Sequence, residues 1–250
     1  MRSVPPCSFD PKRLERIARM EEWHFWFRGR RAYIESWLTR IALPHGEKAL
    51  DIGCGTGWMV RWLAAKGLRP IGLDSLAPAL ARLRAHNPSL PSVQGDAEHL
   101  PFRTASVSLI LCLDVLEHLD DRQALHEAWR VLSPGGWLIL AVPAMPGLWS
   151  ARDEAAGHRC RYTRRLLHQR LQEAGFCIVE LRFYMFLLFP LIALSRWLGR
   201  FRPSLQDTEE HPPTFLNQLL FYLLRLEIAI GRRIPWPWGS TLLALARKGC

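Results

Sequence analysis

A glycine-rich segment is the clearest candidate for chemistry in this chain of 250 residues. It runs from Asp51 to Gly57 with the sequence DIGCGTG, between a predicted buried strand and a predicted helix. Glycines let the backbone turn sharply and approach a ligand closely, and the helix start offers free N–H groups. Asp74 ends the next predicted strand, where a carboxylate can accept hydrogen bonds from both hydroxyls of a ribose. These features predict a nucleoside site, and the alternative is a glycine turn beside a solvated aspartate.

The segment does not match the dinucleotide fingerprint, because Trp58 stands where the third glycine is required. Instead, the chain resembles the class I S-adenosylmethionine-dependent methyltransferases over about residues 48–183, and is similar to the small-molecule, quinone-pathway type. The resemblance implies S-adenosylmethionine as the cofactor and S-adenosylhomocysteine as its product. It rests on five segments in order: Leu50–Gly57, Gly72–Asp74, Gly95–Phe102, Leu113–Leu119 and Leu132–Gly136.

The resemblance also implies which residues would bind each part of this cofactor. Gly53 and Gly55 would pass beneath its methionine part, and Asp51 would orient the loop or the ammonium group. Asp74 would hold the ribose. The full implied set is Asp51, Gly53, Cys54, Gly55 and Asp74, then Ser75, Leu76, Asp96 and Ala97 around the adenine, and Asp114 and Val115 beside the sulfonium.

Methyl transfer is an in-line displacement, so the protein mainly aligns the acceptor and removes its proton where required. The resemblance makes His118 a candidate base; the alternative is a helix-start residue hydrogen-bonded to the backbone. Asp153 and His158, in the loop after the fifth strand, are further candidate bases. Trp149, Arg161 and Tyr162 in the same loop are candidate acceptor contacts, with Arg161 for an anionic group. The alternative is a loop held by its own ion pairs.

An aromatic strip covers Trp23–Arg31 near the N-terminus. In many small-molecule methyltransferases the N-terminal helices lie over the cofactor, so residues 1–47 are predicted to form a helical lid that excludes water. Trp26 would then contact the acceptor, whereas His24 is interpreted as a packed side chain. The alternative is that the whole strip packs on the core.

Alternating strands and helices are expected to position these residues. The pattern predicts an α/β, doubly wound, Rossmann-like sheet of seven strands, mostly parallel with the last strand antiparallel. The core would comprise residues 48–183 and 239–250. Helices are expected over 10–43 with Asp10 as cap, and over 58–66, 77–85, 121–131 and from Thr163 to Gly175; strands over 49–52, 70–74, 92–94, 108–113, 137–142, 176–183 and 241–248.

A helical, apolar insertion is predicted over residues 184–238, where family members often have a simple hairpin. Its two apolar runs do not span a bilayer comfortably, since a spanning helix needs about 18 or more apolar residues. The insertion is interpreted as an acceptor cap, a dimer interface, an interfacial membrane anchor or extra core. Basic and aromatic residues that suit anionic headgroups flank it: Arg196, Arg200, Arg202, Arg232, Arg233, Trp197, Trp236 and Trp238.

Composition narrows the function classes further. The chain is 49% hydrophobic and 22% charged, which excludes a disordered or fibrous protein. Six cysteines form no CxxC pair, so we expect no metal site and a reducing cytoplasmic compartment. The net charge of +10 lies outside residues 49–157, which carry 9 basic and 11 acidic groups.

The charge therefore favours an anionic partner beside the acceptor loop and the insertion, such as the inner face of a membrane or a phosphate-bearing lipid. We expect methyl transfer to a small apolar or lipid-linked acceptor, at oxygen before carbon or nitrogen. A nucleic-acid methyltransferase and a non-catalytic, membrane-associated partner subunit are the alternatives. Nucleic acid is disfavoured because no Asn/Asp-Pro-Pro-Tyr/Phe motif occurs. The oligomeric state stays open.

Overall fold

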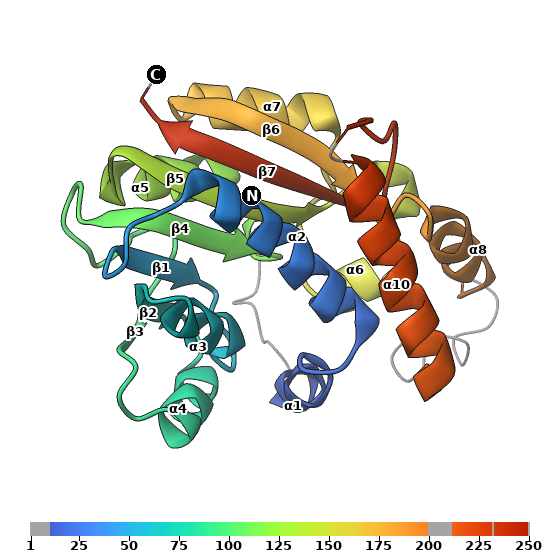
Figure 1. Cartoon of the computed structure of the whole chain (residues 1–250), viewed down its shortest axis with the longest axis horizontal. Helices are drawn as coiled ribbons and strands as arrows, with labels where there is room; N and C mark the ends of the chain where they lie inside the picture. Colours follow the sequence, from blue (N-terminus) through green and yellow to red (C-terminus); the bar gives the residue numbers. More distant parts are fainter. Residues whose placement is uncertain (1–10, 200–211, 232, 250) are drawn as a thin grey trace, which may run out of the picture.

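The structure is a computed structural model that describes residues 11–199, 212–231 and 233–249 (Figure 1). The predicted cap Asp10 and the flanking Arg200, Arg202 and Arg232 lie outside the described residues, as does the side chain of Trp197.

Seven strands form a single sheet in the order β3-β2-β1-β4-β5-β7-β6. The first five pair in parallel, and β7 runs antiparallel to both β5 and β6, which confirms the predicted fold class. The order reverses between β1 and β4, and in such sheets ligands bind beyond the carboxyl ends of the strands at that point. The strands are β1 (Lys48–Ile52), β2 (Arg69–Asp74), β3 (Ser92–Gln94), β4 (Val107–Leu113), β5 (Leu132–Pro143), β6 (Phe176–Tyr184) and β7 (Thr241–Lys248).

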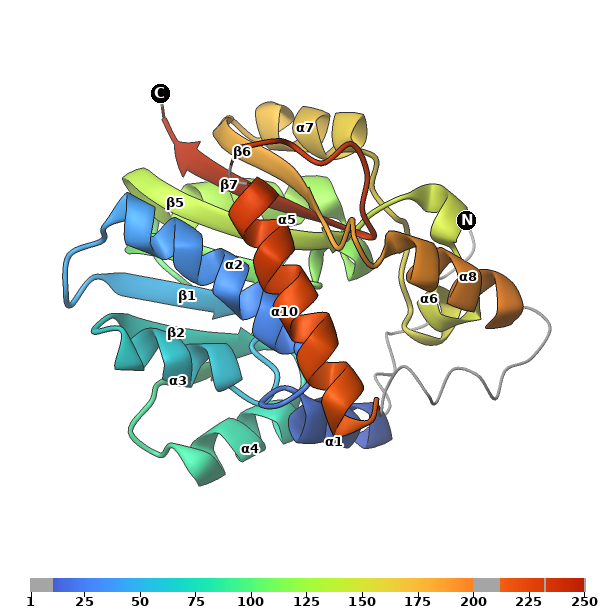
Figure 2. The ribbon, with the colours of Figure 1, turned by 45° about the vertical axis from the view of Figure 1, so that its right-hand side comes forward.

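Helices cover both faces of the sheet (Figures 1 and 2). They are α1 (Pro11–Met20), α2 (Phe25–Ile41), α3 (Trp58–Ala65), α4 (Ala77–His86), η1 (Leu116–His118), α5 (Asp121–Val131), η2 (Pro146–Leu148), α6 (Ala151–Ala155), α7 (Arg164–Glu173), α8 (Phe189–Gly199) and α10 (Thr214–Gly231). Thr163 Oγ1 accepts from Leu166 N at 3.1 Å, and Gly175 follows the helix with φ +85°, so the predicted limits of α7 are confirmed.

Side chains of successive strand residues alternate between two cores, as period-two geometry requires. In β4, Leu109 and Leu111 join a cluster with Trp37 of α2 and Leu224 of α10. Their neighbours Ile110 and Cys112 join the opposite cluster, which includes residues of α5 and α7. The sheet is therefore buried on both faces, and α2 and α10 share one of them.

The single helix expected over residues 10–43 is wrong, because the chain turns between α1 and α2. His24 caps α2 by accepting from Trp26 N at 3.2 Å. Asn217, which is 3% exposed on α10, accepts from Phe25 N at 2.7 Å and donates to the Trp23 carbonyl at 2.8 Å. A partner almost 200 residues away therefore satisfies the backbone groups that the break leaves open.

The predicted insertion contains two helices, α8 and α10, on either side of residues 200–211. In Figure 2, α10 runs alongside α2 across the face of the sheet. Buried Glu227 accepts from Leu187 N at 3.0 Å, and the Trp236 indole donates to the Glu227 carbonyl at 3.2 Å. These contacts connect α10 to both ends of the insertion.

Candidate active site

A cavity of about 1270 Å³ opens at the carboxyl ends of β1 and β4, where the strand order reverses. All eleven residues of the implied cofactor set line this one cavity, and so do residues of α1, α2, α8 and α10. Of the candidate acceptor and catalytic residues, Trp26, His118, Asp153, His158 and Arg161 line it as well.

The glycine-rich loop forms the floor of the cavity. Gly53 and Gly55 have φ of +68° and +53°, which side-chain-bearing residues rarely adopt. A Cβ at Gly53 would lie 2.3 Å from Val115 Cγ2, whereas a Cβ at Gly55 would meet nothing within 4 Å. Gly53 therefore lets the loop pack against Val115, and Gly55 exposes the backbone to the cavity.

Asp74 links this loop to the end of β2. One carboxylate oxygen accepts from Gly55 N at 2.8 Å and the other from Leu76 N at 2.9 Å. Burial is the main influence on this carboxyl and raises its pKa. Each carboxylate oxygen can accept more than one hydrogen bond, so Asp74 keeps acceptor capacity toward the cavity.

Asp51 lies at the end of β1 and is 3% exposed. Burial raises its pKa to about 7, and the charge of Arg30 opposes that rise. Among the described residues its carboxyl has no hydrogen-bond donor, although it borders the cavity. A buried carboxyl of this kind favours a cationic ligand, which would lower its pKa again.

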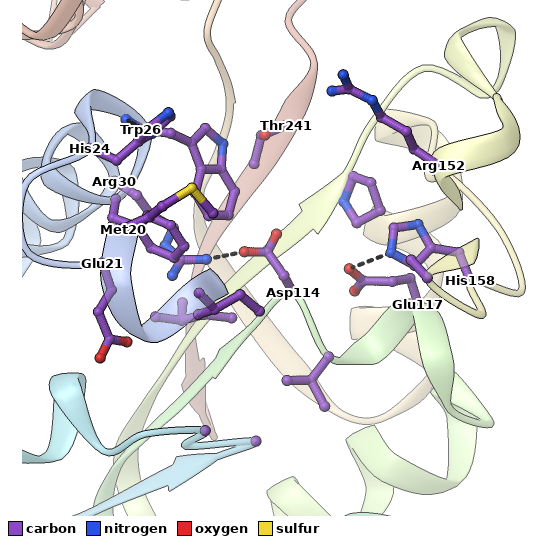
Figure 3. Close-up of a pocket in the computed structure, with 18 of the residues that line it drawn as sticks. Met20, Glu21, His24, Trp26, Arg30, Asp114, Glu117, Arg152, His158 and Thr241 are labelled. Atoms are coloured by element: carbon purple, nitrogen blue, oxygen red, sulfur yellow. Dashed lines mark hydrogen bonds and ion pairs between the residues drawn. The ribbon is translucent and has the colours of Figure 1, made fainter. Parts of the chain in front are cut away.

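The N-terminal helices form the wall opposite the acceptor loop (Figure 3). Arg30 of α2 forms an ion pair with Asp114, and its guanidinium lies 4.5 Å from the centroid of the Trp26 ring. Glu21 accepts a hydrogen bond from Thr56 of the glycine loop, which attaches the turn between α1 and α2 to the cavity floor. Side chains from residues 20–30 thus line this wall of the cavity, and the lid role stays a prediction.

His158 and Glu117 lie on the other side of Asp114 in Figure 3. His158 Nδ1 is 2.9 Å from Asp153 Oδ1, and Nε2 is 3.8 Å from Glu117 Oε1. The His118 ring lies edge-on to His158 at 4.8 Å between centroids. Burial, together with the negative charge of Asp114, raises the pKa of Glu117 well above its usual range.

Four of the predicted roles are wrong, those of Asp153, Tyr162, Trp149 and Arg161. Asp153 is no base, because hydrogen bonds from His158 and Arg161 overcome its burial and hold its pKa well below the usual range. Tyr162 is 0% exposed and its hydroxyl is 3.2 Å from Asp121, so it is a core residue rather than an acceptor contact. Trp149 donates its indole N–H to Glu154 Oε1 at 3.2 Å and lies outside the cavity.

Arg161 lines the cavity, but its guanidinium is already engaged. It donates to Asp153 at 2.9 and 2.8 Å and to the Ala144 carbonyl at 2.9 Å. The expectation that it binds an anionic group of the acceptor is therefore replaced by a positioning role. Arg161 fixes Asp153, which in turn fixes His158.

Sequence reasoning missed Glu117, Glu21 and Arg30 as cavity residues. Glu117 had a signal, since it stands beside His118 in the quoted segment Leu113–Leu119 directly after a strand. Arg30 and Glu21 lie in the segment predicted as a lid, but no local pattern singles them out. Their contacts depend on how α2 crosses the sheet.

Comparison with known proteins agrees with this geometry. Residues 50–140 match the family described as "Methyltransferase domain". This chain carries a class I S-adenosylmethionine-dependent methyltransferase domain. A relative from Mycolicibacterium smegmatis, named a probable S-adenosylmethionine-dependent methyltransferase, is 31% identical over 163 residues, covering 64% of this chain and 62% of that protein.

A ubiquinone biosynthesis O-methyltransferase from Paracidovorax citrulli is 32% identical over 115 residues, covering 42% of this chain and 47% of that protein. The chain thus spans about half to two thirds of the length of these curated relatives. Among solved structures, the complex between the Haloferax volcanii Trm112 methyltransferase activator and a protein described as a methyltransferase gives a TM-score of 0.66 at 20% identity, over 94% of this chain and 95% of that one. This last likeness concerns the fold of the methyltransferase domain.

Proposed function

We propose that this protein transfers a methyl group from S-adenosylmethionine to a small apolar or lipid-linked acceptor, with oxygen as the preferred nucleophile. The observation that carries the proposal is the single cavity, which joins all eleven implied cofactor residues to the Glu117–His158 pair. The acidic groups around the glycine loop suit a ligand with a cationic sulfonium and ammonium. Asp51, Asp74, Asp114 and Glu21 all line that half of the cavity.

When bound, the cofactor supplies a methyl group that is already activated on its sulfonium. Asp51 and Asp74 hold its polar groups, and α1 and α2 exclude water from the reacting centre. We assign activation of an acceptor hydroxyl to Glu117 and His158, the polar pair on the acceptor side. The relative named a ubiquinone biosynthesis O-methyltransferase supports the choice of oxygen.

The insertion supports an apolar acceptor. Its side chains reach the cavity next to the acceptor loop, and only Ser195 and Arg196 among the described ones on the wall are polar. The others are apolar: Met185, Leu188, Leu191, Ile192, Leu194, Pro212, Leu216 and Leu220. Contact of an apolar acceptor with these side chains would remove apolar surface from water, at about 25 cal/mol for each Å². The polar pair then fixes which atom of the acceptor is presented for methylation.

The outer face of α10 supports a lipid-linked acceptor at an anionic membrane surface. Exposed apolar residues follow helical spacing there, and Phe215 and Tyr222 are 80% and 66% exposed. Arg225, exposed three residues after Tyr222 on α10, and exposed Arg233, just after the end of the helix, complement anionic headgroups. Among the described residues α10 alone is long and apolar enough to cross a membrane, but its inner face packs on α2, which favours a helix lying along the surface. We infer a cytoplasmic protein that binds the inner membrane face.

Methyl-labelled cofactor added to purified protein with cell extract tests the reaction. After separation into lipid, small-molecule and nucleic-acid fractions, we expect label in a lipid or small-molecule fraction. Label in nucleic acid alone would favour the nucleic-acid alternative, and no transfer or cofactor binding would favour a partner subunit. The activator in the Haloferax volcanii complex keeps that last alternative relevant.

Binding to anionic vesicles tests the surface of α10 separately. Phe215→Gln with Tyr222→Gln should weaken vesicle binding, and Val179→Gln, 46% exposed on β6, is the matched control. Equal binding by the α10 variant and the control would contradict a membrane role for this helix.

A further inference from the structure

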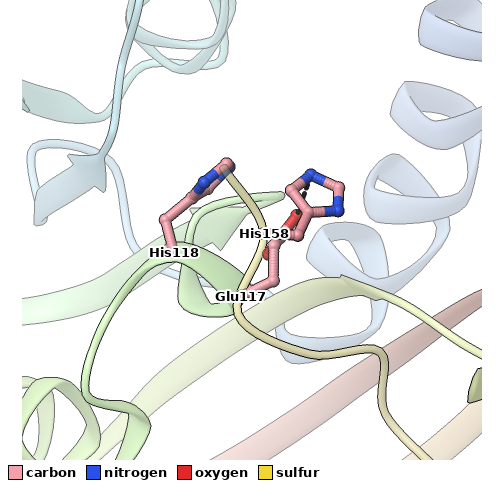
Figure 4. A group of neighbouring side chains, drawn as sticks. All are labelled: Glu117, His118 and His158. Atoms are coloured by element: carbon pink, nitrogen blue, oxygen red, sulfur yellow. Dashed lines mark ion pairs between the residues drawn. The ribbon is translucent and has the colours of Figure 1, made fainter. Parts of the chain in front are cut away.

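Glu117, His118 and His158 form a compact cluster on the acceptor side of the cavity (Figure 4). Each offers one potential ligand atom, and these atoms all lie within 4.8 Å of one another. Two of the residues come from η1 after β4, and the third comes from the loop after α6. Two histidines and one carboxylate are a donor set that binds divalent transition metals with positions left open.

The environment of the Glu117 carboxylate also points to a ligand. Its side chain is 1% exposed, yet Oε2 has no hydrogen-bond partner. A buried carboxylate oxygen without a partner costs free energy that a bound cation would recover. Its other oxygen faces His158 Nε2 at 3.8 Å, which is longer than a hydrogen bond.

His158 is oriented as a metal ligand would be. The Asp153 carboxylate, held by Arg161 and Arg196, can only accept at His158 Nδ1, so this nitrogen carries the proton. In a neutral imidazole, the form that binds a metal, the lone pair would then be on Nε2, which faces Glu117. A carboxylate behind a histidine is the common arrangement around metal-binding imidazoles.

The distances are compatible with one ion. Two ligands of an ion at about 2.1 Å lie about 3.0–3.4 Å apart, so the pair at 3.8 Å must approach by less than about 1 Å. The pairs with His118 lie within 4.8 Å and must approach by less than about 2 Å. His118 is partly exposed, and its Nδ1 is 3.3 Å from the Gly157 carbonyl. One ring nitrogen of His118 would be the third ligand, since it lies within 4.8 Å of the ligand atoms of Glu117 and His158.

We propose that Glu117, His118 and His158 bind a divalent transition cation that coordinates the acceptor. The sequence-based expectation of no metal site considered only the cysteines. Glu117, His118 and His158 all line the cavity, so the acceptor class would be one that presents a hydroxyl to the cation, alone or beside a second oxygen. This role rests on the proposed function and specifies how the Glu117–His158 pair activates the acceptor.

The proposed methyl transfer needs only the acceptor, S-adenosylmethionine and water as reactants. The cation-bound hydroxyl gives its proton to water, because the cation lowers its pKa. The acceptor oxygen then forms the new bond to the methyl carbon, while the bond from that carbon to sulfur breaks and its electron pair stays on sulfur.

Cobalt and manganese titrations of tag-free protein, first stripped with chelator, test the site directly. We expect one Co²⁺ per chain with visible absorption bands of low-symmetry coordination. Glu117→Gln and His158→Gln should each weaken that binding about 100-fold or more, since even outer-shell changes cost 10–100-fold. His168→Gln, exposed on α7, is the matched control and should bind as the wild type does.

Absence of stoichiometric binding, or equal affinity in Glu117→Gln, would overturn the metal site. Methyl transfer that persists unchanged after complete removal of metal would overturn its role in the reaction, while the proposed function would stand. Loss of S-adenosylmethionine binding in the metal-loaded wild type would instead refute the proposed function, because the metal titration does not depend on it.

Discussion

Replacing Asp51 by Asn should raise the free energy of unfolding of the ligand-free protein, although removing a buried charged group usually lowers it. In the ligand-free protein the pKa of Asp51 is about 7, raised from 3.8 mainly by burial. At about 1.4 kcal/mol for each pKa unit, full ionisation of this carboxyl destabilises the fold by about 4 kcal/mol. Asn has a similar shape and cannot ionise, so it avoids this cost.

The direction in which pH changes the free energy of unfolding follows from the number of protons that each state binds. Between the unfolded pKa near 3.9 and the folded pKa of about 7, the folded state binds more protons, so its stability falls as pH rises. From pH 5 to pH 8 the wild type should lose about 3 kcal/mol relative to Asp51→Asn. Urea denaturation of both proteins without ligand, at four pH values across that range, measures this difference.

Asp96→Asn provides the control, because Asp96 lines the same cavity with its side chain 57% exposed. Its stability relative to the wild type should stay within about 0.5 kcal/mol across the range. A difference between wild type and Asp51→Asn that does not change from pH 5 to pH 8 would refute the burial argument for this carboxyl.

Three further variants test other parts of the structure. Arg30→Met removes a charge that lowers the pKa of Asp51, so the pH-dependent loss of stability should move to higher pH; an unchanged midpoint in the urea series would contradict this. Asn217→Leu removes the two hydrogen bonds that Asn217 forms with the Phe25 N–H and the Trp23 carbonyl and should destabilise the protein by about 2–4 kcal/mol, measured by urea denaturation. Gly53→Ala introduces a Cβ 2.3 Å from Val115 at φ +68°, so calorimetry should show S-adenosylmethionine affinity at least about tenfold lower.

The cofactor half of the cavity could be predicted because its determinants are local in sequence. The glycine loop and Asp74 each follow a strand directly, and parallel strands bring their carboxyl ends to one edge of the sheet. Residues on separate strands, such as Asp96 and Asp114, therefore meet at one cavity without any knowledge of side-chain packing.

The other half depends on contacts between distant segments, which periodicity does not encode. The break before α2 is stabilised by Asn217 from α10, so the local pattern was read as one helix. Tyr162 looked like an acceptor contact, but it lies in the core beside Asp121 of α5. The local sequence predicts Asp153 as a base, but in the folded loop its carboxylate is held by Arg161 and His158.

Calorimetric titration of the purified protein with S-adenosylmethionine is the most direct test of the central claim. We predict saturable binding of one molecule per chain, tightening as pH rises toward about 7, because ionised Asp51 favours the cationic ligand. Asp51→Asn should bind more weakly at pH 8 and lose this pH dependence. Absence of saturable binding to the folded wild-type protein would contradict the assignment of this cavity as a cofactor site.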